Sequence, residues 1–239
     1  MELLSSSALL WSPVVANNRM NRKRQASGIN SYEKELQFTP QSWLNDRLQQ
    51  NGQAAWLDLC CGEGNALLQY AREAAENQRQ ANIRLKGIDL VDQFQPIPSG
   101  IHCVRFETCP LDNWTSDTQY DLVTCVHGLH YVGDKLRVLA AILKAIGSEG
   151  IFLANLDLKS IRIAGDPQHQ YIKKLFAGEN ISYNSRKKII SCRGPRDISF
   201  KVSYQGADDK AGPNYTGQEA VDSYYIVFCI VYLILIIYN

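Results

Sequence analysis

Neither sign of charge dominates this sequence. Its 239 residues include 25 lysines and arginines against 24 aspartates and glutamates, which leaves a net charge of +1 at pH 7. No overall field therefore draws the chain to nucleic acid or to an anionic membrane. The 45% of hydrophobic residues excludes a fully disordered, collagen-like or disulfide-knotted chain. The length suits one large domain with its own core.

Recognisable metal-binding motifs are missing as well. The seven cysteines follow no regular spacing, and the adjacent pair Cys60 and Cys61 is not a CxxC motif. The four histidines form no HExxH sequence, so we expect no metal site. An odd number of irregularly spaced cysteines instead favours reduced thiols and a cytoplasmic location.

The N-terminus does not have the order of a secretory signal. The weak apolar stretch Ala8–Trp11 comes before the basic residues Arg19, Arg22, Lys23 and Arg24, whereas a signal has its basic residues first. We expect a flexible leader that passes into an amphipathic segment. Few aromatic residues interleave with the basic cluster, which favours a solvated helix face or a lid over an RNA-binding site.

Charge is absent from the C-terminal tail. Residues 223–239 include no charged side chain, and Tyr224 to Tyr238 are all apolar or aromatic. A helix of that length would measure about 23 Å, short of the roughly 30 Å core of a bilayer. Three hypotheses remain open for the tail: a buried strand or helix, a short anchor for membrane association, or the interface of a homodimer.

What the sequence does contain, from residue 54 onward, is an alternation of strand-length apolar runs with helical patterns. Strands are predicted at Ala55–Leu59, Arg84–Asp89, His102–Phe106, Asp121–Val126 and Gly150–Leu156, and helices around residues 66–74, 136–146 and 169–177. Alternating elements of this kind require crossovers and predict a parallel sheet with helices on both faces.

The pattern changes near the C-terminus. Lys187–Ser191 and Ile198–Val202 are separated by Cys192–Asp197, which is too short for a crossover and therefore predicts a hairpin. The predicted fold class is α/β, with a doubly wound, mostly parallel sheet that ends in a C-terminal antiparallel hairpin.

Three regions follow from this organisation. We expect a helical lid or substrate segment in residues 1–50, a core domain in residues 51–206, and a loop with the apolar tail in residues 207–239. Tyr32 and Trp43, in the predicted lid, are candidates to cap a pocket at the carboxyl ends of the strands, where doubly wound proteins bind ligands.

The turn after the first predicted strand is the most informative part of the chain. Gly62 and Gly64 allow the backbone to turn sharply and to approach a ligand, and the helix that follows offers free N–H groups. Asp58, at the strand end, has a carboxylate suited to an ammonium group or a bound water. Asp89 ends the next strand, where an acid accepts hydrogen bonds from both ribose hydroxyls. The combination predicts a nucleoside-binding site.

The same turn indicates which nucleoside. Cys60 stands where a dinucleotide-binding loop has its first glycine, and Glu63 lies inside the loop, where its carboxylate would repel a diphosphate. S-adenosylmethionine, with a sulfonium and an ammonium group, fits an acidic loop better than NAD does.

These motifs together resemble those of the class I S-adenosylmethionine-dependent methyltransferases. The segment Asp58–Gly64 resembles their motif I, acid-x-Gly-x-Gly-x-Gly, with a cysteine at the first glycine. Gly87–Leu90, Asp121–Tyr131 and Leu139–Leu156 resemble the second, fourth and fifth motifs. The resemblance covers about residues 52–205 and implies a seven-stranded Rossmann-like sheet whose last strand is antiparallel.

The resemblance also implies which residues contact the cofactor, all of them near strand ends. The implied contacts are Asp58, Cys60, Gly62 and Gly64 for the methionine part, Asp89 for the ribose, Leu90, Thr108 and Cys109 for the adenine, and Val126 and His127 for the carboxypropyl arm.

An acceptor of high pKa needs a general base in addition. His127 and His130 flank the end of the fourth strand, and a histidine with its ordinary pKa near 6.5 can take a proton from a hydroxyl. Both are candidate bases, with packing or cofactor contact as the alternative role. Tyr131, Asn155 and Asp157 are candidates to line the acceptor pocket, and capping a turn is the alternative for Asp157.

The loop after the fourth strand limits the classes of methyl acceptor that the sequence allows. Enzymes that methylate exocyclic amines of DNA have an acid or Asn, then Pro-Pro and an aromatic residue there, and cytosine-C5 enzymes have a Pro-Cys nucleophile. Cys125–Gly128 matches neither pattern. We therefore expect transfer to a small molecule and no action on DNA. The alternatives are a protein or RNA methyltransferase and a non-catalytic S-adenosylmethionine-binding module.

Overall fold

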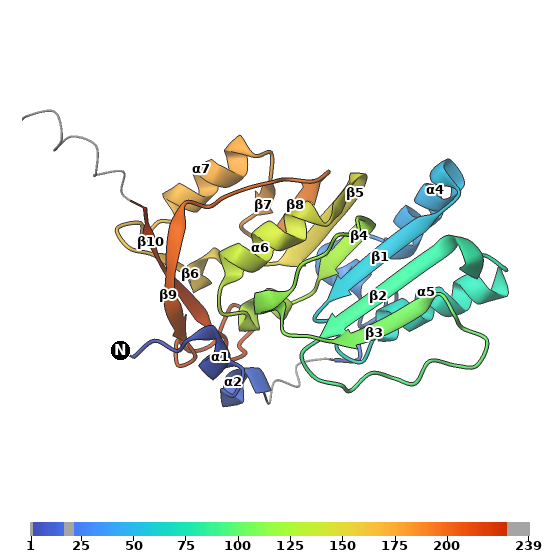
Figure 1. Ribbon diagram of the computed structural model, residues 1–239, viewed down its shortest axis with the longest axis horizontal. Coiled ribbons are helices and arrows are strands. Elements are labelled where there is room, and N and C mark those ends of the chain that lie inside the picture. Colours follow the sequence, from blue (N-terminus) through green and yellow to red (C-terminus); the bar gives the residue numbers. More distant parts are fainter. Residues whose placement is uncertain (1, 17–21, 229–239) are drawn as a thin grey trace, which may run out of the picture.

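The computed structural model describes residues 2–16 and 22–228. Its centre is a seven-stranded sheet in the order β3-β2-β1-β4-β5-β8-β7 (Figure 1). The strands are β1 (Ala54–Leu59), β2 (Ile83–Asp89), β3 (Val104–Thr108), β4 (Tyr120–Cys125), β5 (Ile146–Asn155), β7 (Ser182–Asn184) and β8 (Ile189–Arg193). Strands β1 to β5 pair in parallel, and β8 is antiparallel to both β5 and β7. The α/β fold class is thereby confirmed.

Helices cover both faces of this sheet, as its apolar central strands require. The helices are α1 (Ser6–Leu9), α2 (Pro13–Ala16), α3 (Tyr32–Leu36), α4 (Pro40–Asn51), α5 (Asn65–Glu76), α6 (Lys135–Lys144) and α7 (Gln170–Gly178). Helices α4 and α5 pack with Trp56 and Leu122 on one face, and α6 and α7 pack with Leu57 and Val123 on the other. Successive residues of one strand thus serve opposite halves of the core. Short 3-10 helices connect several elements: η1 (Gln80–Asn82), η2 (Leu111–Asn113), η3 (Gly128–Tyr131) and η4 (Leu158–Ser160).

The antiparallel hairpin is present, but one of the two strands predicted to form it was wrong. β8 pairs with β7, which precedes it, and not with the segment Ile198–Val202 that follows it. Ile198 and Phe200 are buried without strand pairing, and the Phe200 ring meets that of Phe176 on α7 edge to face. Their alternating pattern therefore reflects packing beneath a helix, which a strand pattern resembles in sequence.

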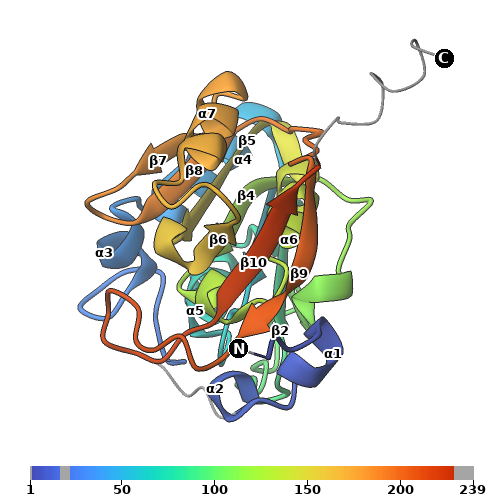
Figure 2. The same ribbon diagram turned by 90° about the vertical axis from the view of Figure 1, so that its left-hand side faces the viewer.

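A second, three-stranded sheet in the order β6-β10-β9 stands beside the first (Figure 2). It contains β6 (Ile161–Ile163), β9 (Val202–Asp208) and β10 (Asp222–Val227). β9 runs across the boundary at residues 206 and 207 that the sequence predicts between the core domain and the tail region.

The first residues of the uncharged tail lie in β10, where Ser223 and Tyr225 are buried. The rest of the tail, residues 229–239, lies outside the described residues, so its membrane-anchor and homodimer hypotheses stay predictions. Within residues 2–16 and 22–228, no helix is both long and apolar enough to cross a bilayer.

Lys135, the first residue of α6, links the second sheet to the segment that leads into this helix. Its side chain is 1% exposed, and its Nζ donates to the carbonyls of Val132 and Val221 and to Ser223 Oγ over 2.7–3.0 Å. Burial lowers the pKa of Lys135 to about 7. The three acceptors come from two different parts of the chain, which makes this lysine the polar link between them.

We expect Lys135→Ala to lower the free energy of unfolding by about 2–4 kcal/mol, because three buried acceptors lose their donor. Urea denaturation of the variant and of wild type measures the difference. Lys144→Ala, at the exposed end of the same helix, is the matched control and should change stability by less than about 0.5 kcal/mol. Equal effects of the two substitutions would contradict the linking role of Lys135.

Candidate functional site

The turn between β1 and α5 places positive φ angles at three alternate residues, at one end of the sheet. Cys60 has φ +54°, Gly62 +61° and Gly64 +76°. Cys60 thus adopts the left-handed conformation that the glycine of the common motif favours. At Gly62 a side chain would have no room, since its Cβ would lie 2.7 Å from the carbonyl oxygen of Arg22.

Asp89 ends β2 directly beside this turn. Its Oδ2 accepts from the Gly62 amide at 2.8 Å, and its Oδ1 accepts from the Arg22 guanidinium at 2.9 Å and from the Val91 amide at 3.2 Å. An ionised carboxylate offers about four lone-pair positions, of which three are taken. One ribose hydroxyl can therefore bind as the structure stands, and two can bind once Arg22 moves aside.

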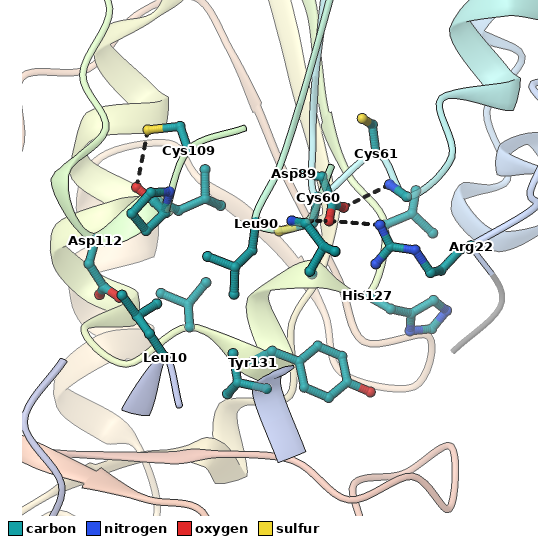
Figure 3. Close-up of a pocket in the computed structure, with 18 of the residues that line it drawn as sticks. Leu10, Arg22, Cys60, Cys61, Asp89, Leu90, Cys109, Asp112, His127 and Tyr131 are labelled. Atoms are coloured by element: carbon teal, nitrogen blue, oxygen red, sulfur yellow. Dashed lines mark hydrogen bonds and ion pairs between the residues drawn. The ribbon is translucent and has the colours of Figure 1, made fainter. Parts of the chain in front are cut away.

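A cavity opens over these residues at the carboxyl ends of the strands (Figure 3). Seven of the predicted cofactor residues line it: Cys60, Gly62, Asp89, Leu90, Cys109, Val126 and His127. Tyr131, predicted to face the acceptor, lines it as well. The labelled side chains of Leu90, Asp89, Arg22 and Tyr131 surround its centre in the close-up.

Three predicted cofactor residues do not line the cavity. Asp58 is 0% exposed, and its oxygens accept from the Tyr32 hydroxyl at 2.7 Å and from Thr124 Oγ1 at 2.6 Å. Gly64 packs against β3, where a Cβ would lie 2.3 Å from the Phe106 ring. Thr108 is exposed on the edge strand β3. Direct cofactor contacts from these three stay predictions.

Asp58 instead connects the N-terminal segment to the core. Burial is the main cause that raises the pKa of Asp58 to about 7, against the lowering effect of its two hydroxyl donors. Tyr32, which donates one of those bonds from α3, lines the cavity, and its role in a lid stays a prediction. Trp43 lies elsewhere, against the sheet, where its indole donates to the Asp121 carbonyl.

The sequence interpretation missed the part that the N-terminal segment plays in the cavity. Arg22, Arg24, Leu10 and Val15 all line it. The basic cluster was a signal, but its spacing is equally typical of a solvated helix face. Only the fold shows that the Arg22 side chain is 13% exposed and lies on Asp89.

The polar groups and the apolar side chains that line this cavity fit an adenosyl cofactor with a methionine arm. Asp89 can accept from ribose, while Leu90, Val91, Pro110 and Leu111 offer an apolar wall to the adenine. The buried Nε of Arg22 has no hydrogen-bond partner among the described residues, so it is available to a carboxylate. These features match the chemistry of S-adenosylmethionine.

We expect Arg22→Ala to bind 5′-methylthioadenosine about 3- to 10-fold more tightly than wild type, because a ribose no longer competes with a nearly buried guanidinium for Asp89. That probe has the ribose and adenine but no carboxylate. S-adenosylhomocysteine should gain less, since its carboxylate loses a donor. Calorimetric titration measures both, and an unchanged ratio of the two affinities would contradict this role.

His127 and His130, the two candidate bases, differ in their position relative to the cavity. His127 lines the cavity, and its Nε2 lies 3.0 Å from Glu35 Oε2 on α3. His130 is 0% exposed and does not line the cavity, and burial is the main cause that lowers its pKa to about 3. His130 is therefore neutral and a weak base at physiological pH.

The other two predicted acceptor residues lie close by. The Asn155 side-chain oxygen accepts from the His127 amide at 3.3 Å. Asp157 accepts from the Lys159 amide and so caps η4, which is the alternative role considered for it. It also forms an ion pair with Lys188.

The sequence matches the model of a known protein family. A family model described as a methyltransferase domain matches residues 29–192. A search of curated proteins finds no match.

Among solved structures, similarity extends to a S-adenosylmethionine-dependent methyltransferase from Thiobacillus denitrificans in complex with S-adenosylhomocysteine. The two sequences are 25% identical, and the match covers 49% of this chain and 48% of that protein's chain with a TM-score of 0.37. The DhpI–SAH complex is 17% identical with coverages of 69% and 89% and a TM-score of 0.39. The plantazolicin methyltransferase BpumL is 14% identical with coverages of 62% and 51% and a TM-score of 0.38. This chain thus spans about half the length of the first of these structures.

Proposed function

This chain belongs to the family of methyltransferase domains, whose class I members use S-adenosylmethionine, and on that premise we propose that it transfers a methyl group from this cofactor to a small molecule. The observation that carries the proposal is Asp89, held at the end of β2 by the Gly62 amide with its carboxylate in the cavity. The Rossmann-like sheet, with β8 antiparallel, is the arrangement that the class I resemblance implies.

S-adenosylmethionine supplies an activated methyl group for in-line displacement by a nucleophile. The chain has to hold the acceptor in line and keep water out. Asp89 and the turn at Gly62 would fix the adenosyl end, and Arg22 would meet the carboxylate. His127 and Tyr131, on the β4 side of the cavity, would face the acceptor.

The N-terminal segment supports a small acceptor. Leu10 and Val15 line the cavity, and Val15 belongs to an apolar cluster with Leu90 and Tyr131. The segment thus covers the cavity with apolar side chains, which suits a small, partly apolar molecule better than a folded macromolecule. RNA and protein acceptors remain the alternatives.

Two measurements test the proposal. Calorimetric titration with S-adenosylhomocysteine tests for the cofactor site. Transfer of labelled methyl from S-adenosylmethionine to a metabolite panel, to total RNA and to protein tests for the activity. Transfer to the metabolites alone would support the proposal, and transfer to RNA or protein alone would overturn the acceptor class. Binding without any transfer would favour the non-catalytic module, and no binding would overturn the proposal entirely.

We also propose a reducing compartment such as the cytoplasm. The six cysteines of the described ranges are all free thiols, including the buried Cys61 and Cys125. Such thiols are typical of proteins kept under reducing conditions.

A further inference from the structure

Glu35 and His127 form a pair that joins the N-terminal lid to the end of β4. The two residues are 92 positions apart in sequence, yet their side chains meet at 3.0 Å. His127 adopts φ +59°, and its backbone amide donates to Asn155, so both its main chain and its ring are held. Its side chain is 6% exposed and lines the cavity.

The partner at Nε2 decides which ring nitrogen has the proton. Glu35 also accepts from the Arg24 guanidinium, with 3.1 Å between Arg24 Nη2 and Oε1. The hydrogen bond from His127 is the main cause that lowers the pKa of Glu35, so this carboxylate is ionised and can only accept. In the neutral form of the ring, the hydrogen-bond network therefore assigns the proton to Nε2 and a lone pair to Nδ1.

That lone pair has nothing to accept from. Nδ1 of His127 is buried and has no hydrogen-bond partner within the described parts of the chain. A buried nitrogen left without a partner costs about 1–3 kcal/mol, which a ligand with a hydrogen-bond donor would recover. The ring that lines the cavity thus presents an unpaired acceptor.

Two aromatic rings lie beside the ring of His127. The ring centroid of His130 lies 5.6 Å from that of His127. The ring centroid of Tyr215, in the loop between β9 and β10, lies 6.2 Å from that of His127. Both neighbours are neutral, since burial raises the pKa of Tyr215 to about 12 and lowers that of His130. The charged groups near the ring are Glu35 and, behind it, Arg24.

We propose that the acceptor is a hydroxyl compound, that His127 Nδ1 removes the hydroxyl proton, and that Glu35 is the positioning residue that orients His127. The proposal rests on the proposed methyltransferase function. The acceptor oxygen forms a bond to the methyl carbon as the carbon–sulfur bond breaks. The electron pair of the broken carbon–sulfur bond stays on sulfur. The proton passes from the oxygen to Nδ1, and the Glu35 carboxylate balances the charge of the imidazolium.

Nitrogen NMR of the full chain with labelled histidines tests the geometry without any acceptor. The ring of His127 should show a protonated Nε2 and an unprotonated Nδ1. Glu35→Gln should shift this tautomer balance, whereas Glu33→Gln should not, because Glu33 on the same helix accepts from Thr39 instead. A protonated Nδ1 in the wild-type protein would overturn the proposal.

Kinetics test the chemistry. Labelled methyl transfer is measured to phenols whose pKa falls from about 10 to about 7, and to amines, thiols and carboxylic acids. His127→Asn, which tolerates the positive φ, should lower kcat by about 10²–10⁴-fold with the least acidic phenol and by less as the phenol becomes more acidic. Glu35→Gln should lower kcat by about 10- to 100-fold without changing KM for the cofactor.

The outcomes separate the two proposals. Transfer to amines, thiols or acids but not to hydroxyls, or a His127→Asn loss that is the same for every phenol, would overturn the base assignment while leaving the methyltransferase function intact. Failure to bind S-adenosylhomocysteine would instead overturn the proposed function. Loss of activity in Glu33→Gln equal to that in Glu35→Gln would reduce the role of Glu35 to holding α3 in place.

Discussion

We expect the Asp89→Ala variant to bind S-adenosylhomocysteine about 10²–10⁴-fold more weakly than wild type, because two charge-assisted hydrogen bonds to ribose are lost at about 1.5–3 kcal/mol each. Asp89 is 6% exposed, so water cannot readily replace it. The same substitution leaves the Gly62 amide without its acceptor, which loosens the turn that approaches the cofactor. Calorimetric titration measures the change.

Two matched variants separate ribose binding from support of the turn. Asp89→Asn keeps an oxygen for the Gly62 amide but presents an N–H₂ group to the ribose, so it should lose most of the affinity while the turn at Gly62 keeps its support. Asp92→Ala removes an exposed acid three residues further along and should bind as wild type does. If Asp89→Ala and Asp92→Ala bound equally well, the site proposed here would be the wrong one.

The second large effect is expected on stability, at Asp58. Asp58→Ala should lower the free energy of unfolding by about 2–4 kcal/mol, since the buried hydroxyls of Tyr32 and Thr124 lose their acceptor. Asp58→Asn has nearly the same shape and can still accept one of these bonds, so it should lose less. Urea denaturation measures both, and an equal loss in the two variants would contradict this account.

Asp58 should also make stability depend on pH in a direction opposite to that of most carboxylates. Its pKa is raised to about 7 in the folded chain, whereas an unfolded aspartate has a pKa of about 3.9. The folded state therefore binds more protons between these values, and the contribution of Asp58 is fully present below about pH 4 and is lost as the pH rises through 7.

The matched comparison is wild type against Asp58→Asn at pH 5 and pH 8, because the other titrating groups are common to both. Wild type should lose more stability than the variant between these two values. A parallel pH dependence of the two proteins would show that Asp58 keeps an ordinary pKa in the folded chain.

Much of the proposed cofactor site was predictable from the order of neighbouring elements along the chain. A strand, a glycine turn, a helix and a second strand that ends in an acid are brought together by any right-handed parallel crossover. Gly62 and Asp89 meet for that reason, whatever the remainder of the chain does. The family resemblance added the role of each position but not its surroundings, and so it could not show that Gly64 serves packing against Phe106.

Contacts between distant segments were not predictable in this way. Glu35 with His127 and Arg22 with Asp89 join positions 92 and 67 residues apart, and no periodicity or spacing encodes such pairs. His127 and His130 looked equivalent in sequence, because both follow β4. Both rings are buried, and what separates them is the cavity, which His127 lines and His130 does not.

The order of the amino acids alone was thus enough for the parallel sheet, the glycine turn and the acid at its side, because these depend on neighbours along the chain and on the handedness of the crossover. The position of the N-terminal segment over the cavity, the pairing of β7 with β8 and the choice of His127 as the cavity-lining histidine could be learned only from the folded chain. They depend on which distant surfaces bury one another, and that is a property of the whole packed molecule.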